Sequence, residues 1–209
     1  MFLLREPSEE QIWQFIASQR ELPFSYAEVG ATQAGAPDGY TVDHNRIKLG
    51  EGRATYERAI DALRRWWHFD LGWVRIVAAD TPVEVGPTVA VLARHLGFWS
   101  LNASRVVYLI DDEKSVKLDA SYQDRMQARM PALPGRFGFA YGTLPDHAER
   151  GEERFTIEWH TKDDSVWYDI LAFSRPNKLL ARIAYPVARR LQKQFARESL
   201  AKMIKVSRE

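Results

Sequence analysis

The chain has 209 residues, of which 45% are hydrophobic and 27% are charged, and its formal net charge is +1. This composition is typical of a soluble globular protein with one large domain, or one domain and an appendage. Cysteine is absent, which excludes disulfides, thiolate zinc sites and cysteine nucleophiles and fits a cytoplasmic protein. We expect no signal peptide or membrane span, because no apolar run approaches roughly 18 residues.

A short helical appendage is predicted at the N-terminus. Ser8 and Gln11 fit a capping box, with Ser8 as the N-cap, and Leu22-Pro23 ends the helix. The Gly-, Ala- and Pro-rich segment that follows is typical of an irregular connection. We therefore predict an N-terminal appendage with its connection over residues 1–36 and a main domain over residues 37–209.

The main domain is predicted to begin with a strand over 40–49 and a helix over 53–67. Apolar residues recur at helical spacing in that helix, at Tyr56, Ala59, Ile60, Leu63 and Trp67. Runs rich in Val, Ile and aromatic residues then predict strands over 73–79, 84–95, 97–102, 104–111, 136–144, 153–160 and 166–173. The polar segment 113–135 interrupts them as an insertion and is a candidate lid.

A long basic helix is predicted from about residue 176 to 205, with Ser174 as its N-cap and a kink at Pro186. Residues 177–209 hold nine Lys or Arg and two acidic residues, so this part carries +7. That charge suits docking on an anionic membrane surface, and it equally suits the solvated face of a terminal helix. Basic and aromatic residues are not interleaved on a predicted strand, so we predict no nucleic-acid binding.

The order of elements predicts an α+β fold, with a curved antiparallel sheet of six to seven strands wrapped around the long C-terminal helix. An antiparallel sheet must cover its concave face, and the last helix is the element long enough to do so. This is the helix-grip arrangement of START-like and Bet v 1-like proteins. It leaves a cavity between sheet and helix.

Three segments carry a resemblance to a known family: YTVDHNRIKLGEG, GFAYGTLPDHAERGEERF, and VWYDILAFSRP followed by Pro186 and Gln192. They resemble the bacterial and plant domain-of-unknown-function family 1990, over roughly Phe24 to Met203. The run Y-G-T-L-P-x-H-x-x-x-G-E-E-x-F is the most specific part. The resemblance implies no activity that can be transferred.

Glu153, His147 and Tyr141 are the candidate catalytic residues. Alternation places Glu153 on the inward face with Phe155 and Ile157, where a carboxylate is costly unless it is paired. It is a candidate ligand-binding group or general base, or the partner of an arginine. His147, in the preceding loop, suits proton transfer near neutral pH, although Pro145-Asp146-His147 also fits an ordinary turn. Tyr141 is a candidate hydrogen-bond donor to a ligand carbonyl, or a core tyrosine.

Three further residues complete the predicted site. Thr143 shares the face of Tyr141, and the opposite, small face of Gly138, Ala140 and Gly142 is expected to line the cavity, with room for a close-packed helix or a ligand. Trp167 and Tyr168 point to opposite faces, so at most one faces the cavity. Arg175, at the predicted start of the last helix, opposes the helix dipole and suggests an anionic partner such as Glu153, Asp169 or a ligand carboxylate. The ligand-binding set is therefore Tyr141, Thr143, His147, Glu153, Trp167 and Arg175.

No metal site or cofactor is predicted, because the five histidines lack ligand spacing and the glycines lack a phosphate-loop pattern. The favoured function is binding of a hydrophobic small molecule or lipid in the cavity. The alternative is an acid/base enzyme of the hydrolase, cyclase or lyase type, acting on a carbonyl or ester ligand in the same cavity.

Overall fold

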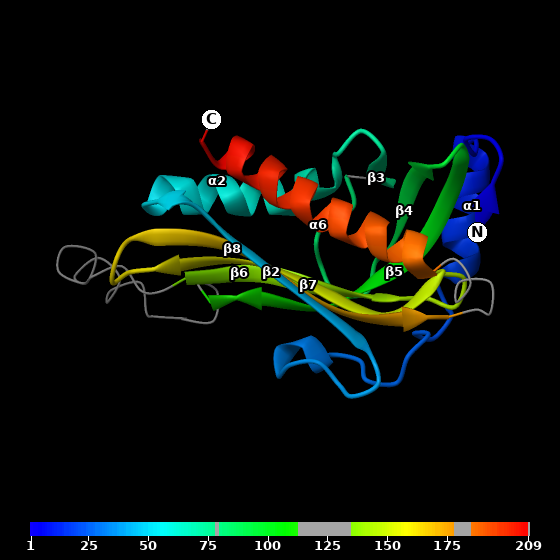
Figure 1. Ribbon diagram of the computed structural model, residues 1–209, viewed down its shortest axis with the longest axis horizontal. Helices are drawn as coiled ribbons and strands as arrows, with labels where there is room; N and C mark the ends of the chain where they lie inside the picture. The colour runs from blue at the N-terminus through cyan, green and yellow to red at the C-terminus, as the bar shows by residue number, and fades with distance from the viewer. Residues whose placement is uncertain (78–79, 113–134, 178–184, 209) are drawn as a thin grey trace.

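The computed structural model describes residues 1–77, 80–112, 135–177 and 185–208 (Figure 1). The strands are β1 (Phe2–Leu3), β2 (Thr41–Glu51), β3 (Val74–Val77), β4 (Thr88–His95), β5 (Phe98–Asp111), β6 (Gly135–Thr143), β7 (Glu149–His160) and β8 (Ser165–Pro176). The helices are α1 (Glu9–Gln19), α2 (Arg53–Arg64) and α6 (Tyr185–Arg208), with 3-10 turns η1 (Ala31–Gln33) and η2 (Trp67–Phe69).

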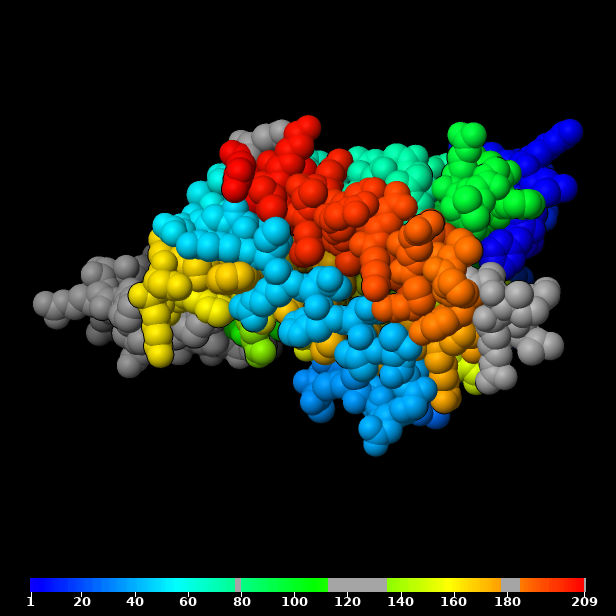
Figure 2. Space-filling view, in the orientation of Figure 1, coloured from blue at the N-terminus to red at the C-terminus, as the bar shows by residue number. Residues whose placement is uncertain are grey.

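The strands form one antiparallel sheet in the order β2-β8-β7-β6-β5-β4-β3, with β1 paired to β5. The sheet curls around α6, and α2 lies beside α6 on the same face, which we call the concave face (Figure 1). In the space-filling view, α6 lies against β2 and α2 (Figure 2). The predicted α+β, helix-grip architecture is confirmed. Among the described helices, none is both long and apolar enough to cross a membrane.

The opposite, convex face is covered by the N-terminal part of the chain. The predicted capping box of α1 is present, with Ser8 as N-cap. The Gln11 amide donates to the Ser8 hydroxyl, and the Ser8 amide donates to Oε1 of Gln11. Ile12 and Ile16 of α1 pack with Leu92 and Leu101 in a separate apolar cluster on β4 and β5. Residues 20–40 continue across this face (Figure 1). The appendage therefore packs on the sheet, and a domain boundary at residue 36 stays a prediction.

Two predicted details of the helices are wrong. α2 ends at Arg64, because Trp66 adopts a left-handed φ of 59°, so Trp66 is buried and Trp67 is exposed. Ser174 is not a helix cap: β8 continues to Pro176 and pairs Ser174 with Thr41 and Gly151. Pro176 is therefore the last residue of a strand and does not begin a helix.

Other predictions shift in extent. The strands predicted over 97–102 and 104–111 are one strand, β5, and β7 begins at Glu149 rather than at Glu153. The candidate lid over 113–135 and the predicted helix start over 178–184 lie largely outside the described residues.

The concave core is built from aromatic side chains. Phe139, Phe155 and Tyr168 are fully buried and meet Trp66 and Phe69 from the turn after α2. Ring centroids of Phe139 and Trp66 lie 4.8 Å apart with their planes at 69°, a favourable edge-on arrangement. This core fills the space under α2 and the C-terminal half of α6, where Met203 is fully buried.

Glu152 anchors the N-terminal connection to the convex face. Its carboxylate accepts hydrogen bonds from the Tyr26 hydroxyl at 2.6 Å, the Gly30 amide at 2.7 Å and the Thr32 amide at 3.0 Å, and from the Thr32 hydroxyl. The Tyr26 ring lies where a side chain at Gly142 would stand. The prediction that the small face of this strand lines the cavity is therefore wrong: Gly142 faces the convex side and makes room for this connection.

We expect Glu152→Ala to lower the free energy of unfolding by about 3 kcal/mol, because buried donors on Tyr26, Gly30 and Thr32 would lose their acceptor. Urea denaturation measures the loss, and limited proteolysis should show faster cleavage near residues 24–40. Glu158→Ala is the matched control on the same strand and face, where Glu158 pairs with Arg46 at the surface, and should cost less than about 1 kcal/mol. Equal losses in the two variants would contradict the anchoring role.

Candidate functional site

A cavity of about 780 Å³ lies between the concave face of the sheet and α6. Its lining is mainly apolar and includes Phe69, Val91, Ile170, Leu191, Phe195 and Leu200. A concave, mainly apolar space of roughly 300 to 1,000 Å³ with a few polar groups is typical of small-molecule sites. The polar groups of this cavity come from β2, β4, β5, the β6–β7 region, β8 and α6.

Tyr141 and Glu153 form the pair nearest the middle of the wall. They are opposite each other in the β6–β7 register, and the Tyr141 hydroxyl donates to Oε2 of Glu153 at 2.7 Å. Burial raises the pKa of Glu153 to about 7 despite this hydrogen bond, and the carboxylates of Asp43 and Glu149 add to the increase. At neutral pH the Glu153 carboxyl group therefore populates both protonation states, and it can take up or release a proton.

Glu149 is a second carboxyl group in the cavity wall, and it is only 8% exposed. The Gln192 side chain of α6 donates to its Oε2, whereas Oε1 has no hydrogen-bond partner among the described residues. Burial raises the pKa of Glu149, against the lowering effect of Ser174 and Gln192. Gly151 lies between Glu149 and Glu153 on the same face of β7 and adds no side chain to the wall.

Gly151 has a structural reason for lacking a side chain. Its φ is 154°, and a Cβ there would meet the carbonyl oxygen of Phe173 on β8. A larger residue would therefore force β7 and β8 apart. The gap between the two carboxyl groups is fixed by this close approach of the strands.

Asp43 is the third carboxylate of the wall, and it is paired. Both guanidinium ends of Arg189 on α6 donate to Asp43 on β2, one at 2.6 Å. A two-pronged arginine–carboxylate pair has a fixed geometry and balances the charge of both partners. It ties the beginning of α6 to the edge strand of the sheet.

His147 lines the cavity from the loop between β6 and β7. Its Nδ1 accepts a hydrogen bond from the amide of Glu149 at 3.0 Å, and burial lowers its pKa to about 4. The ring is therefore neutral at pH 7, and its proton is assigned to Nε2. Within the described residues no hydrogen bond joins His147 to Glu153, although both line the same cavity.

Thr143 also lines the cavity, but its hydroxyl is hydrogen-bonded to the Gly151 backbone and to Ser25. It accepts from the Gly151 amide at 2.9 Å and shares a hydrogen bond with the Ser25 hydroxyl at 2.6 Å. These contacts hold the β6–β7 turn against the N-terminal connection. A ligand in the cavity would therefore meet Thr143 mainly through its methyl group.

Trp167 and Arg175 lie on the convex face and do not line the cavity. The Trp167 indole donates to Ser165, with the guanidinium of Arg46 over its ring. The Arg175 guanidinium lies 4.3 Å from the ring centroid of Tyr40. Arg175 belongs to a strand rather than to a helix start, and among the described residues it forms no ion pair with Glu153 or Asp169.

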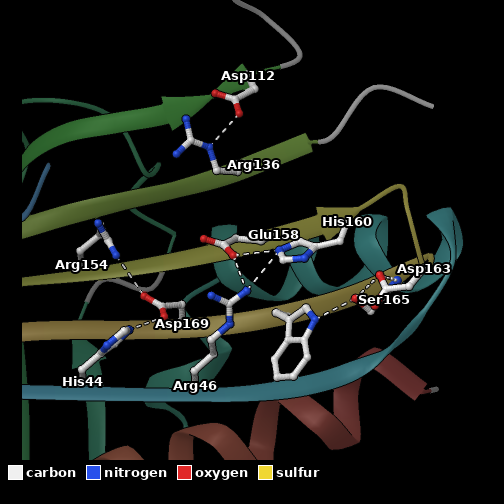
Figure 3. A network of polar contacts seen from close by, with 11 residues as sticks. His44, Arg46, Asp112, Arg136, Arg154, Glu158, His160, Asp163, Ser165 and Asp169 are labelled. Atoms are coloured by element: carbon white, nitrogen blue, oxygen red, sulfur yellow. Dashed lines mark hydrogen bonds and ion pairs between the residues drawn. The ribbon is translucent and has the colours of Figure 1, made fainter. Parts of the chain in front are cut away.

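Asp169 belongs to a polar network on the convex face (Figure 3). It is bonded by Arg154 at 3.1 Å and by His44 at 2.6 Å, while Arg46 bonds Glu158 at 2.6 Å and Glu158 also meets His160 at 3.2 Å. The charges are matched within the network. In the described part of the chain, no group of three or more His, Asp or Glu side chains is arranged to hold a metal ion.

Sequence reasoning missed Glu149, Gln192 and Asp43 as cavity residues. The signal for Glu149 was present, because the alternation that places Glu153 inward continues through Gly151 to Glu149. Asp43 likewise alternates with His44, which lies outward. Gln192 had no signal of its own, since its position depends on how α6 is rotated against the sheet.

The comparisons with known proteins support the resemblance to domain-of-unknown-function family 1990. The model of a domain of unknown function, DUF1990, matches residues 25–202. A UPF0548 protein of Dictyostelium discoideum is 37% identical, over 98% of this chain and 95% of the relative. A UPF0548 protein of Deinococcus radiodurans is 36% identical, over 99% of both chains.

Among solved structures, a hypothetical protein from Helicobacter pylori is similar with a TM-score of 0.46 and 10% identity, over 81% of this chain and 88% of that one. A likeness of this size adds nothing to the argument about the site. The match of the family model and the two relatives covers nearly the whole chain. The protein therefore belongs to the DUF1990 family.

Proposed function

We propose that this protein binds a hydrophobic small molecule or lipid in the cavity between the sheet and α6. The observation that carries the proposal is the cavity itself, about 780 Å³ of mainly apolar space in a chain that elsewhere fills its core with aromatic side chains. Well-packed interiors contain few voids larger than a water molecule. A space of this size therefore requires an occupant or a function.

The polar residues suit the orientation of such a ligand. Tyr141, Glu153, His147 and Glu149 belong to β6, β7 and the loop between them, while apolar side chains from β4, β8 and α6 form much of the remaining lining. A few convergent polar groups in an apolar pocket typically fix the direction in which a ligand lies. Trp167 and Arg175 are not part of this proposal, because they face away from the cavity.

We expect Ala172→Trp to weaken ligand binding, because Ala172 lines the cavity from β8 and an indole would fill part of it. Leu171→Trp is the matched control, since alternation places Leu171 on the convex face. Titration with Nile red, a neutral apolar fluorophore, should give an affinity about tenfold lower in Ala172→Trp than in Leu171→Trp, a difference of about 1.4 kcal/mol. Equal binding in both variants, or no binding by the wild-type chain, would sink the proposal.

The Glu153 carboxyl group should make folding depend on pH. Its folded pKa of about 7 lies above that of an unfolded glutamate, so its contribution is favourable at low pH and is lost as pH rises towards 7. Glu153→Gln removes the cost of the buried charge, and we expect it to be more stable than wild type by about 1–3 kcal/mol at pH 8. Thermal unfolding at pH 5 and pH 8 measures this, and an advantage equal at both values would argue against it.

Acid/base catalysis on a carbonyl or ester ligand is the second candidate function. The observation that favours it is the Tyr141–Glu153 pair, in which a carboxyl group with a pKa near 7 lies beside a phenol in an apolar cavity. Ionised Glu153 can act as a general base towards a water molecule, and Tyr141 can donate to the developing oxyanion. His147 is neutral at pH 7, and its Nε2–H can donate a hydrogen bond to a bound ligand.

If the cavity is catalytic, hydrolysis of an octanoate ester should become faster as pH rises through about 7, because Glu153 must be ionised to act as a base. We expect Glu153→Gln to reduce kcat about 100-fold and Tyr141→Phe about tenfold. Wild-type hydrolysis no faster than in Glu153→Gln would leave binding as the function.

Docking on an anionic membrane through the C-terminal helix stays a prediction. It is supported by the exposed cations Arg190 and Lys193 of α6 and by the exposed apolar Leu96 of the β4–β5 turn, which lines the same surface pocket as Arg190. Arg189 does not contribute, because its charge is balanced by Asp43.

A further inference from the structure

Two carboxyl groups of the cavity wall, Glu149 and Glu153, have no ion-pair partner within the described residues. The charges of Asp43 and Arg189 neutralise each other in their two-pronged ion pair. No cation is paired with Glu149 or Glu153 in this part of the chain. Lys193 and Arg197 also line the cavity, but they are exposed side chains of α6 and form no ion pair with either carboxyl group.

Hydrogen-bond donors are also in short supply at these two carboxyl groups. The Tyr141 hydroxyl donates to Glu153, the Gln192 side chain donates to Glu149 and Ser174, and the Ser174 hydroxyl is near enough to Glu149 to lower its pKa. Oε1 of Glu149 remains a buried acceptor without a partner among the described residues, on a residue that is only 8% exposed. A buried acceptor left unsatisfied costs about 1–3 kcal/mol. A ligand that brought a donor would remove that cost once the Glu149 side chain turned Oε1 towards the cavity.

The wall is shaped to admit such a donor. Glu149, Gly151 and Glu153 share one face of β7, and the missing side chain at Gly151 leaves the space between the carboxyl groups free. His147 is neutral at pH 7 and the nearby phenols, Tyr141 and Tyr168, keep their protons, so the positive charge close to these carboxyl groups comes from Arg189, which lowers the pKa of Glu149. The head group of a ligand placed here would face two carboxyl groups.

We propose that the ligand is an apolar molecule with a protonated amine, and that the ammonium group is bound at Glu149 and Glu153 beside Gly151. This deepens the proposed function and rests on it. An ammonium group has three donors and no acceptor, and an ionised carboxylate has acceptors alone, so the two are complementary. Charge-assisted hydrogen bonds of this kind are about twice as strong as neutral ones. A fatty acid would add a third unpaired anion to the wall and is disfavoured.

The test is a displacement series with one apolar tail and three head groups. Dodecylamine, dodecanol and dodecanoate compete with bound Nile red at pH 8, where Glu153 is ionised and the amine is still protonated. We expect the amine to bind at least about tenfold more tightly than the alcohol, and the carboxylate to bind most weakly.

Two variants locate the preference. Glu149→Gln and Glu153→Gln should each reduce the ratio of amine to alcohol affinity several-fold, because each replaces a charged acceptor with a neutral amide. Glu158→Gln makes the same change on the convex face of the same strand, and it should leave the ratio as in wild type. Thermal unfolding of each variant separates loss of preference from loss of the fold.

The outcomes distinguish the two proposals. Nile red that binds and is displaced equally well by amine and alcohol overturns the amine assignment and leaves apolar binding standing. The tightest binding by dodecanoate overturns it as well. Failure of Nile red and all three competitors to bind the wild-type chain overturns both proposals together.

Discussion

The alternation of β7 is the constraint on which both faces of this protein depend. Consecutive residues of a strand point to opposite sides of the sheet, so Glu152 and Glu153 face apart although they are adjacent in the chain. Glu152 holds the N-terminal connection to the convex face, and Glu153 lies in the cavity wall on the concave face. A slip of one residue in the register would exchange these two roles, which explains why β7 is fixed on both sides by long ladders with β6 and β8.

The cavity exists because α6 is held firmly at its C-terminal half and more loosely at its beginning. The C-terminal half packs into the aromatic core through Met203, bonds Tyr168 through Ser199 at 3.1 Å, and meets α2 where Arg58 donates to the carbonyl of Ser207 at 2.9 Å. The first half contacts the sheet through polar pairs, Arg189 with Asp43 and Gln192 with Glu149. Polar pairs hold the helix in place without filling the space beneath it with side chains.

Sequence periodicity predicted the sheet, the last helix and the inward position of Glu153, because a two-residue period depends on the strand alone. It did not decide which face of β6 lines the cavity, and the face of Tyr141 does so rather than the small face. It did not predict where strands end. Because Pro176 was predicted in the first turn of a helix, Ser174 and Arg175 were not assigned to β8. Because β7 was predicted to begin at Glu153, Glu149 was not recognised as a strand residue. Alternation places Trp167 and Arg175 on the same face of β8 as Asp169. It therefore excludes Trp167 and Arg175 from the face of Tyr168 and Ile170. The convex cover over residues 20–40 has no periodicity, so its contacts with Glu152 follow from tertiary packing and have no local signal.

Glu152 and Glu153 also show how a structural carboxylate differs from one kept for a ligand. The two have the same chemistry and are next to each other, yet Glu152 receives four hydrogen bonds from Tyr26, Gly30 and Thr32, whereas Glu153 receives one, from Tyr141. Both carboxyl groups lose hydration when they are buried, and only for Glu152 do hydrogen bonds within the protein replace it. A glutamine at 153 would keep the hydrogen bond to Tyr141 without the charge. Stability alone therefore does not account for a glutamate at this position, and the physical role left for its charge is interaction with something that enters the cavity.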